Sequence, residues 1–101
     1  MKILRRGDST LEVCSLQKLA VTNAVLVRDT VRAALNSSIT RLDIDLSEVT
    51  FMDSAGLGTL ISLRKSLDTQ KGTVRLLHPA PNVCQILEIT RLRQVFEIIN
   101  P

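Results

Sequence analysis

The sequence predicts an α/β fold, with a mixed, largely parallel sheet of four to five strands and about three helices packed on it. Short strand patterns alternate with helical patterns along the chain, and the connections between them are short, which is typical of crossover units. Hydrophobic residues make up 45% of the 101 residues, with two Phe and no Trp or Tyr. This aliphatic composition is typical of Val, Ile and Leu strands. The length suits one domain, which we expect to span residues 1–101.

The first part of the chain is predicted to form two strands and a helix. Residues 2–5 and 10–16 have the pattern of short strands joined by a turn. A helix is expected to start after Thr22 or Asn23, either of which can cap it, and to end at residues 36–38. Its apolar face is formed by residues at helical spacing, namely Ala24, Val27, Val31, Ala34 and Leu35.

The middle of the chain repeats the strand-to-helix order. Residues 41–46 alternate between apolar and acidic side chains, as a half-buried strand does, and residues 49–52 form a second apolar segment. A helix is then expected from Ser54 onward, and Gly72 is expected to stop it. Its apolar positions recur at helical spacing, at Leu57, Leu60, Ile61 and Leu67.

The last part of the chain completes the alternation. Residues 73–77 are predicted to be a strand. Pro79 and Pro81 are placed to open a short helix, because proline is well tolerated in a first helical turn. Residues 95–99 are predicted to be the closing strand.

Charge and composition disfavour two classes of partner. The net charge is +3, the pI is about 9.3, and the basic residues are scattered, with no run longer than Arg5-Arg6. A nucleic-acid-binding protein more often gathers its basic residues on one element, so no direct nucleic-acid contact is expected. No segment approaches the roughly 20 apolar residues of a membrane span, so no membrane insertion is expected. Two separated cysteines, expected to be buried thiols, and the lack of a signal peptide predict a cytoplasmic protein.

The segment FMDSAGLGTL, residues 51–60, interrupts the apolar pattern with Asp53 and Ser54 and two glycines. Either polar side chain can cap the following helix by accepting hydrogen bonds from its free N–H groups. A cap does not explain the glycines, since Gly58 in a first helical turn costs about 1 kcal/mol relative to alanine. We therefore expect either that the helix packs very closely on the fold or that a partner approaches this end.

A segment of this kind can have three chemical roles. A serine hydrolase is disfavoured because Met52 replaces the first glycine of a nucleophile elbow and the single His78 has a loop pattern. A phosphate-binding loop is disfavoured because Gly56-x-Gly58 lacks the remaining residues of either nucleotide motif. A phosphate attached to Ser54 itself is physically plausible, since a helix N-terminus favours negative charge.

The residues DLSEVTFMDSAGLGTL, 45–60, resemble the signature of the STAS domain, as found in bacterial anti-sigma-factor antagonists. The likeness extends over most of the chain, through the first helix and the closing helix–loop–strand. It implies a STAS-type fold from which the family's C-terminal helix is absent. In the family motif the serine directly after the aspartate is phosphorylated, and the corresponding residue here is Ser54.

The resemblance implies a binding module and not an enzyme, with no cofactor of its own. The partners would be an anti-sigma factor that is also a serine kinase and binds ATP, and a PP2C-like serine phosphatase that reverses the phosphorylation. Regulation of sigma-factor-dependent transcription would follow. The expected partner-binding residues surround Ser54, and they are Asp53, Ala55, Gly56, Leu57 and Gly58.

A second reading is a STAS subunit of a lipid-transport ATPase or signalling scaffold that docks through the same helix end without phosphorylation. It is favoured by the basic charge and by Gln17–Ala20, which lack the glycine and the acid that the family often has there.

Overall fold

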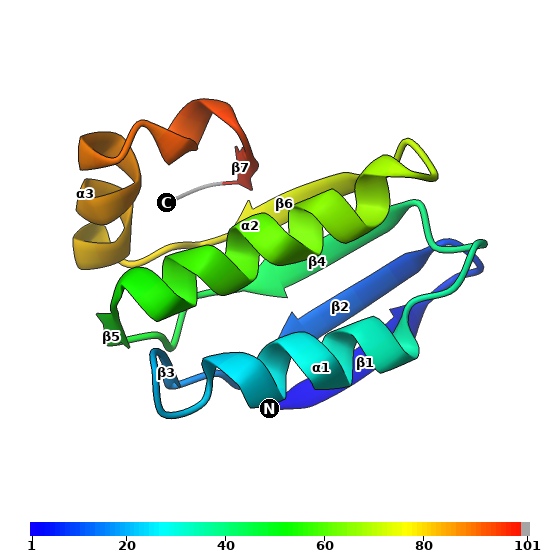
Figure 1. The fold of residues 1–101 in the computed structure, drawn as a ribbon, viewed down its shortest axis with the longest axis horizontal. Coiled ribbons are helices and arrows are strands. Elements are labelled where there is room, and N and C mark those ends of the chain that lie inside the picture. Colours follow the sequence, from blue (N-terminus) through cyan, green and yellow to red (C-terminus); the bar gives the residue numbers. More distant parts are fainter. Residues whose placement is uncertain (100–101) are drawn as a thin grey trace.

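A computed structural model describes residues 1–99 of the chain as a five-stranded sheet with helices packed on it (Figure 1). The strand order is β1-β2-β4-β6-β7, with β1 antiparallel to β2 and the other neighbours parallel. A separate two-stranded parallel sheet joins β3 to β5. The strands are β1 (Lys2–Arg6), β2 (Thr10–Cys14), β3 (Lys18–Leu19), β4 (Arg41–Asp45), β5 (Phe51–Met52), β6 (Thr73–Leu77) and β7 (Glu97–Ile99).

The parallel strands are joined through helices, as short crossover connections require. The helical elements are α1 (Ala24–Ala34), α2 (Ser54–Asp68), α3 (Pro81–Ile89) and the 3-10 turn η1 (Leu92–Gln94). Helices α1 and α2 lie side by side on one face of the sheet, and α3 lies near β5 at one end (Figure 1). The predicted mixed, largely parallel α/β fold with three helices is confirmed. No helix in the described residues 1–99 is both long and apolar enough to cross a bilayer.

The core lies between the sheet and the two central helices. The alternation in β4 sends Leu42 and Ile44 into it, and both are at most 1% exposed. From α2, Leu60, Leu63 and Leu67 enter the same layer, each at most 1% exposed. Burying leucine and isoleucine side chains contributes about 1.5–3 kcal/mol each, so this aliphatic layer holds α2 against the sheet.

Several predicted element boundaries are wrong by a few residues. Strand β2 ends at Cys14 because Ser15 has φ 60°, which no strand residue adopts. Helix α2 ends at Asp68, and the left-handed residue after it is Lys71, where Gly72 was expected to stop the helix. The closing strand starts at Glu97 and not at Val95, since Val95 has helical backbone angles and its N–H donates to the Leu92 carbonyl oxygen of η1.

Two side-chain predictions also need correction. Asn23 occupies the N-cap position of α1 but does not cap it. Its Oδ1 accepts from the backbone N–H of Ala20 at 2.9 Å and its Nδ2 donates to the Lys18 carbonyl oxygen at 2.8 Å, so it braces the preceding loop. Cys14 and Cys84 are free thiols, but each is half-buried where full burial was predicted.

The sheet face opposite α1 and α2 carries a cross-strand ion-pair cluster. Asp43 lies between Leu42 and Ile44 in sequence, so its side chain points away from the core. Arg75 on β6 makes two hydrogen bonds to its carboxylate, at 2.9 and 3.1 Å, and Arg41 lies 3.5 Å from it. The Asp43 side chain is only 6% exposed. The Asp43 carboxylate, and more weakly that of Glu97, raises the pKa of Arg75 above its ordinary value.

We expect Arg75→Ala to destabilise the fold by about 3 kcal/mol, because it leaves the buried Asp43 carboxylate without its bidentate partner. Chemical denaturation measures the change. Arg93→Ala is the control, since Arg93 pairs with Glu88 on an exposed surface and its loss should cost under about 1 kcal/mol. Equal effects for both substitutions would contradict the assignment of Asp43 as a buried, charge-dependent residue.

Candidate functional site

Asp53 joins the start of α2 to the loop between β3 and α1. Its Oδ1 accepts from the backbone N–H of Gly56 at 3.0 Å, which is the expected helix cap. Its Oδ2 accepts from the backbone N–H of Val21 at 2.9 Å, across 32 residues of sequence. The Thr59 hydroxyl, one turn into α2, donates to the Ala24 carbonyl oxygen at 3.1 Å. The first turns of α1 and α2 are therefore held beside each other.

Gly56 marks the closest approach between α2 and the β3 segment. A Cβ atom at this position would lie 1.9 Å from the Leu19 carbonyl oxygen and 2.7 Å from its carbonyl carbon. Both are backbone atoms, and β3 is held to β5 by strand pairing. Gly56 is buried, so close packing within the fold explains this glycine, and it does not lie on an exposed surface as expected.

The two glycines of the motif have different environments. Apart from its chain neighbours and the backbone of its own helical turns, a Cβ at Gly58 would meet no atom of residues 1–99 within 4 Å, and Gly58 is exposed. Packing within the described chain therefore does not require this glycine. Ser54 is also exposed, at the first position of α2, while Ala55 is half-buried and Leu57 is 9% exposed. Of the predicted site residues, Ser54 and Gly58 lie on the surface and Gly56 and Leu57 lie beneath it.

Two exposed valines, one in the loop that Asp53 holds and one in the first turn of α1, were not predicted as site residues. Val21 is 72% exposed and Val25 is 57% exposed. We call the residues Val21, Val25, Ser54, Ala55 and Gly58 the Ser54 surface. The sequence feature that could have indicated these valines is a lack of charge, because residues 19–27 and 54–63 contain no charged side chain. Large exposed apolar side chains that gather at one place are typical of interaction sites.

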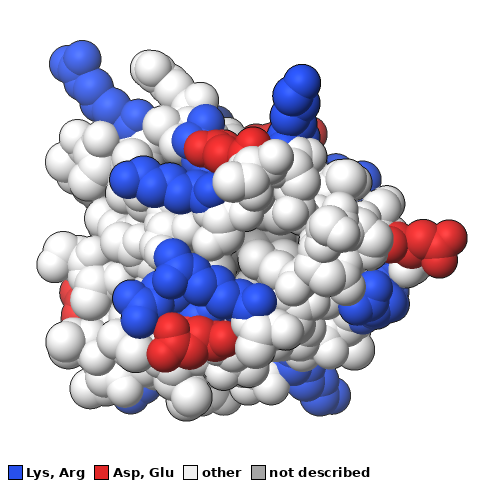
Figure 2. Space-filling view, turned by 45° about the vertical axis from the view of Figure 1, so that its right-hand side comes forward, with Lys and Arg blue, Asp and Glu red and all other residues white. Residues whose placement is uncertain are grey.

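The end of the molecule away from the start of α2 carries many charged side chains. Figure 2 brings forward the right-hand side of Figure 1, away from the start of α2, and shows Lys and Arg side chains spread across it with fewer acidic ones. The basic residues after the uncharged segments begin at Arg28 on α1 and Arg64 on α2. The five residues of the Ser54 surface have no ionisable side chain, and the Asp53 carboxylate lies directly before them in the chain.

The backbone N–H of Val21, followed by that of Gly56, lowers the pKa of Asp53 below its ordinary value of 3.8. Because the folded pKa is below the unfolded one, ionised Asp53 stabilises the fold above the unfolded pKa. That stabilisation is lost as the pH falls below 3.8 and through the folded pKa.

We therefore expect Asp53→Asn to lower the melting temperature at pH 7 and to change it little at the lowest pH at which the protein stays folded. The asparagine accepts hydrogen bonds more weakly than a carboxylate and lacks its charge. Melting curves of both proteins between pH 7 and pH 3 measure the difference. Parallel curves at all pH values would show that the Asp53 charge does not hold the loop.

Comparison with models of protein families shows to which family the chain belongs. Residues 11–100 match the family model described as STAS domain. The chain belongs to the STAS domain family. The resemblance predicted from residues 45–60 is thereby confirmed, and the matched region contains both α2 and the loop that Asp53 holds.

Known STAS-domain proteins resemble the chain in sequence and in fold. An anti-sigma-B factor antagonist of Listeria monocytogenes is 39% identical over 59 residues, 58% of this chain and 52% of that protein. The match thus spans about half the length of that relative. The crystal structure of TM1081 from Thermotoga maritima superposes with a TM-score of 0.90 at 24% identity, over 99% of this chain and 86% of that one.

The anti-sigma factor antagonist SpoIIAA has the same fold in two forms. Its unphosphorylated form has a TM-score of 0.85 at 19% identity, covering 98% of this chain and 87% of that one. Its phosphorylated form, from Bacillus, has a TM-score of 0.72 at 18% identity, covering 98% and 90%. These similarities show the STAS-type fold. The relatives are named as antagonists of regulators, which agrees with the prediction that the protein is not an enzyme.

Proposed function

We propose that this STAS domain is an anti-sigma-factor antagonist that binds an anti-sigma factor/serine kinase and is switched off by phosphorylation of Ser54. The observation that carries the proposal is the position of Ser54. It is exposed, it is the first residue of α2, and it directly follows the capping Asp53. The relative from Listeria monocytogenes is named an anti-sigma-B factor antagonist, which supports this function.

A phosphate on Ser54 would change the surface without unfolding it. The group adds about −1.5 to −2 charges at pH 7, and the N-terminus of α2 favours negative charge. Asp53 is already hydrogen-bonded to Val21 and Gly56, so the fold has a carboxylate at this place and tolerates it. A partner shaped to the uncharged Ser54 surface would instead meet a doubly charged group without a matching cation. The expected switch is therefore loss of docking.

The predicted site residues have three roles in this proposal. Asp53 positions the two loops, and Gly56 and Leu57 allow and hold the close packing beneath the surface. Ala55 and Gly58 lie close to the acceptor serine in the first turns of α2. Because both residues are small, the backbone of the kinase and its bound ATP can approach Ser54. The kinase supplies ATP, so the domain needs no cofactor, and a PP2C-like serine phosphatase restores the unmodified serine. The cycle regulates sigma-factor-dependent transcription in the cytoplasm without contact to nucleic acid.

The experiment incubates the protein with the anti-sigma factor kinase of its own organism and ATP, and maps the phosphate by mass spectrometry. We expect one phosphate, on Ser54, and no phosphate on Ser54→Ala under the same conditions. Subsequent treatment with a PP2C-type phosphatase should restore binding to the kinase. Phosphate on a different residue, or no phosphate with a kinase that binds the protein, would contradict the switch.

One observation favours a second candidate, a STAS subunit of a lipid-transport ATPase or signalling scaffold. Ala20, at the position where the family often has an acid, is 3% exposed and offers no charge to a kinase. In that function the same helix end docks a partner permanently. The test is to purify the protein from cells that express it at its native level. Co-purification of the ATPase subunits of a transporter, with no phosphate on Ser54, would support this second function.

A further inference from the structure

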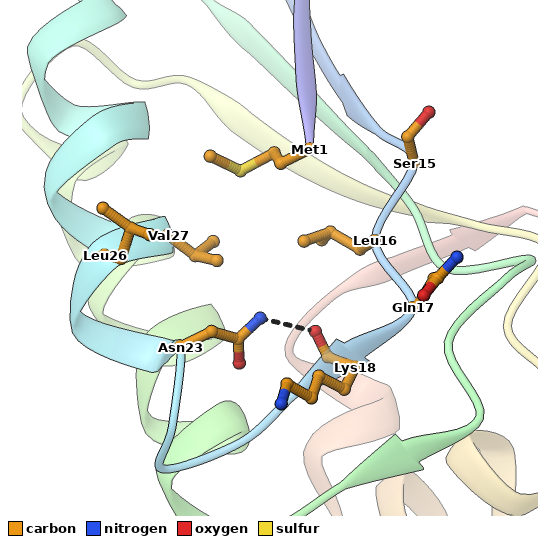
Figure 3. Close-up of a pocket in the computed structure, with 8 residues that line it drawn as sticks. All are labelled: Met1, Ser15, Leu16, Gln17, Lys18, Asn23, Leu26 and Val27. Carbon is orange, nitrogen blue, oxygen red and sulfur yellow. Dashed lines mark hydrogen bonds between the residues drawn. The ribbon is translucent and has the colours of Figure 1, made fainter.

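Asn23 lies at the N-cap position of α1 but does not cap the helix, and its side chain bonds back to the preceding loop. Its Oδ1 accepts from the Ala20 N–H at 2.9 Å, and its Nδ2 donates to the Lys18 carbonyl oxygen at 2.8 Å (Figure 3). An asparagine amide has both an acceptor and a donor group, and here both are used on one loop. The side chain therefore closes residues 18–23 into a fixed turn.

The peptide group between Ala20 and Val21 is held at both ends. The Ala20 carbonyl oxygen accepts from the backbone N–H of Asn23 at 3.0 Å and from that of Ala24 at 2.7 Å. The Val21 N–H, at the other end of this peptide group, donates to Asp53 Oδ2 at 2.9 Å. Because a peptide group is planar and turns as one unit, the direction of the Val21 N–H depends on the turn that Asn23 closes.

The burial of the loop makes the Asn23 side chain hard to replace. Ala20 is 3% exposed, and Leu19 before it is 0% exposed. Without Asn23 Oδ1 the Ala20 N–H would be a buried donor with no acceptor, which costs more than an ordinary hydrogen bond contributes. The loop would have to turn this N–H toward another acceptor or toward water. Such a turn moves the adjacent Val21 N–H away from Asp53.

Asp53 connects this loop to Ser54. Its Oδ2 accepts from Val21, and its Oδ1 accepts from the Gly56 N–H in the first turn of α2 at 3.0 Å. Ser54 is the next residue in the chain and the first of α2. Two side chains, Asn23 before α1 and Asp53 before α2, thus fix the exposed loop residue Val21 relative to the exposed Ser54.

We propose that Asn23 is a positioning residue of the phosphorylation site, which directs the Val21 N–H toward Asp53 and so holds the loop in the arrangement that the kinase recognises beside Ser54. This inference rests on the proposed function. If the loop has this arrangement only part of the time, the apparent affinity falls in proportion to that fraction. Loss of the Asn23 side chain should therefore raise the KM for the protein as a kinase substrate and leave kcat unchanged.

The test compares Asn23→Ala with the wild type in two measurements. NMR titration of the side-chain carboxyl carbons should show a higher pKa of Asp53 in the variant, because the Val21 N–H is the main cause that lowers this pKa. Steady-state phosphorylation of Ser54 by the anti-sigma factor kinase with ATP should show KM for the protein raised about 5- to 10-fold, with kcat within about 2-fold of the wild type.

Asn36→Ala is the matched control. Asn36 follows α1, and its Oδ1 accepts from the Ser38 N–H at 2.9 Å, so it braces a loop at the opposite end of the same helix. Its loss removes a similar local hydrogen bond without reaching Asp53. The pKa of Asp53, KM and kcat should all equal those of the wild type. Changes as large as those in Asn23→Ala would indicate general loosening of the fold and would overturn the inference.

A second variant covers the case in which Asn23→Ala does not fold. Serine is a good N-cap residue but is too short to bond to both Ala20 and Lys18, so Asn23→Ser supports the helix start while removing the brace. The same rise in KM and in the pKa of Asp53 is expected. An unchanged KM in folded Asn23 variants would overturn the inference and leave the proposed function intact. A raised KM with an unchanged pKa would also overturn it, since Asn23 would then act on the kinase directly. A wild-type chain that the kinase does not phosphorylate would overturn both.

Discussion

Gly56→Ala is expected to destabilise the fold by about 3 kcal/mol or more, because the new methyl group would lie 1.9 Å from the Leu19 carbonyl oxygen. Overpacking is tolerated where a flexible side chain can move, but here the opposing atoms are backbone. Relief would require α2 to move away from β3, which weakens the Asp53 hydrogen bond to Val21 and the packing of both helices. Urea denaturation of the variant and the wild type gives the difference directly.

Gly58→Ala is the matched control for this substitution. It lies two residues away in the same helical turn, and its Cβ would meet nothing within 4 Å in residues 1–99 outside its chain neighbours and the nearby backbone of α2. Alanine is the better helix former, so this variant should be more stable than the wild type by up to about 1 kcal/mol. If both alanines stabilised the protein, or both destabilised it equally, the close contact between α2 and β3 would be contradicted.

Ser54→Asp is expected to reduce the affinity for the anti-sigma factor about 100-fold or more, equivalent to about 2.7 kcal/mol, without loss of the fold. The substitution places a charge at the centre of an uncharged surface, where the docked partner would bury it. The same charge lies at the N-terminus of α2, where an acid stabilises a helix by about 0.3–1 kcal/mol. Stability and binding should therefore change in opposite directions.

Two measurements separate these effects. Calorimetric titration gives the loss of affinity, and thermal unfolding gives the stability, which should be unchanged or slightly higher. Ser54→Ala is the control, since it removes the hydroxyl without adding charge and should bind within a few-fold of the wild type. An unfolded Ser54→Asp variant would contradict the first expectation, and full binding by a folded variant would contradict the second.

The long elements could be predicted from the sequence because they have enough residues to show a period. Strand β4 alternates, and α2 repeats its leucines over 15 residues. Strands β3 and β5 have two residues each, too few to show any alternation, so their pairing depends on the tertiary structure. The end of β2 was missed for a similar reason, since Ser15 does not belong to the residue types that usually adopt positive φ.

The candidate site was predictable in its position but not in its geometry. The motif located Asp53, Ser54 and the two glycines, and it left open whether packing or a partner explained the glycines. In the structure, close packing explains Gly56, which lies against the Leu19 backbone. Packing does not explain Gly58, which is exposed and so leaves room for a partner. The contact of Asp53 with Val21 spans 32 residues, a distance over which local sequence patterns carry no information.

The turn between β1 and β2 lies at the opposite end of the sheet from the start of α2 (Figure 1). Gly7 in this turn has φ 66°, and residues 7–9 are exposed. Exposed loop tips of this kind tolerate inserted residues better than any other part of a small domain. A short peptide epitope or a fluorescent label placed after Asp8 would therefore report on this protein, or immobilise it on a sensor surface, while leaving Ser54 accessible.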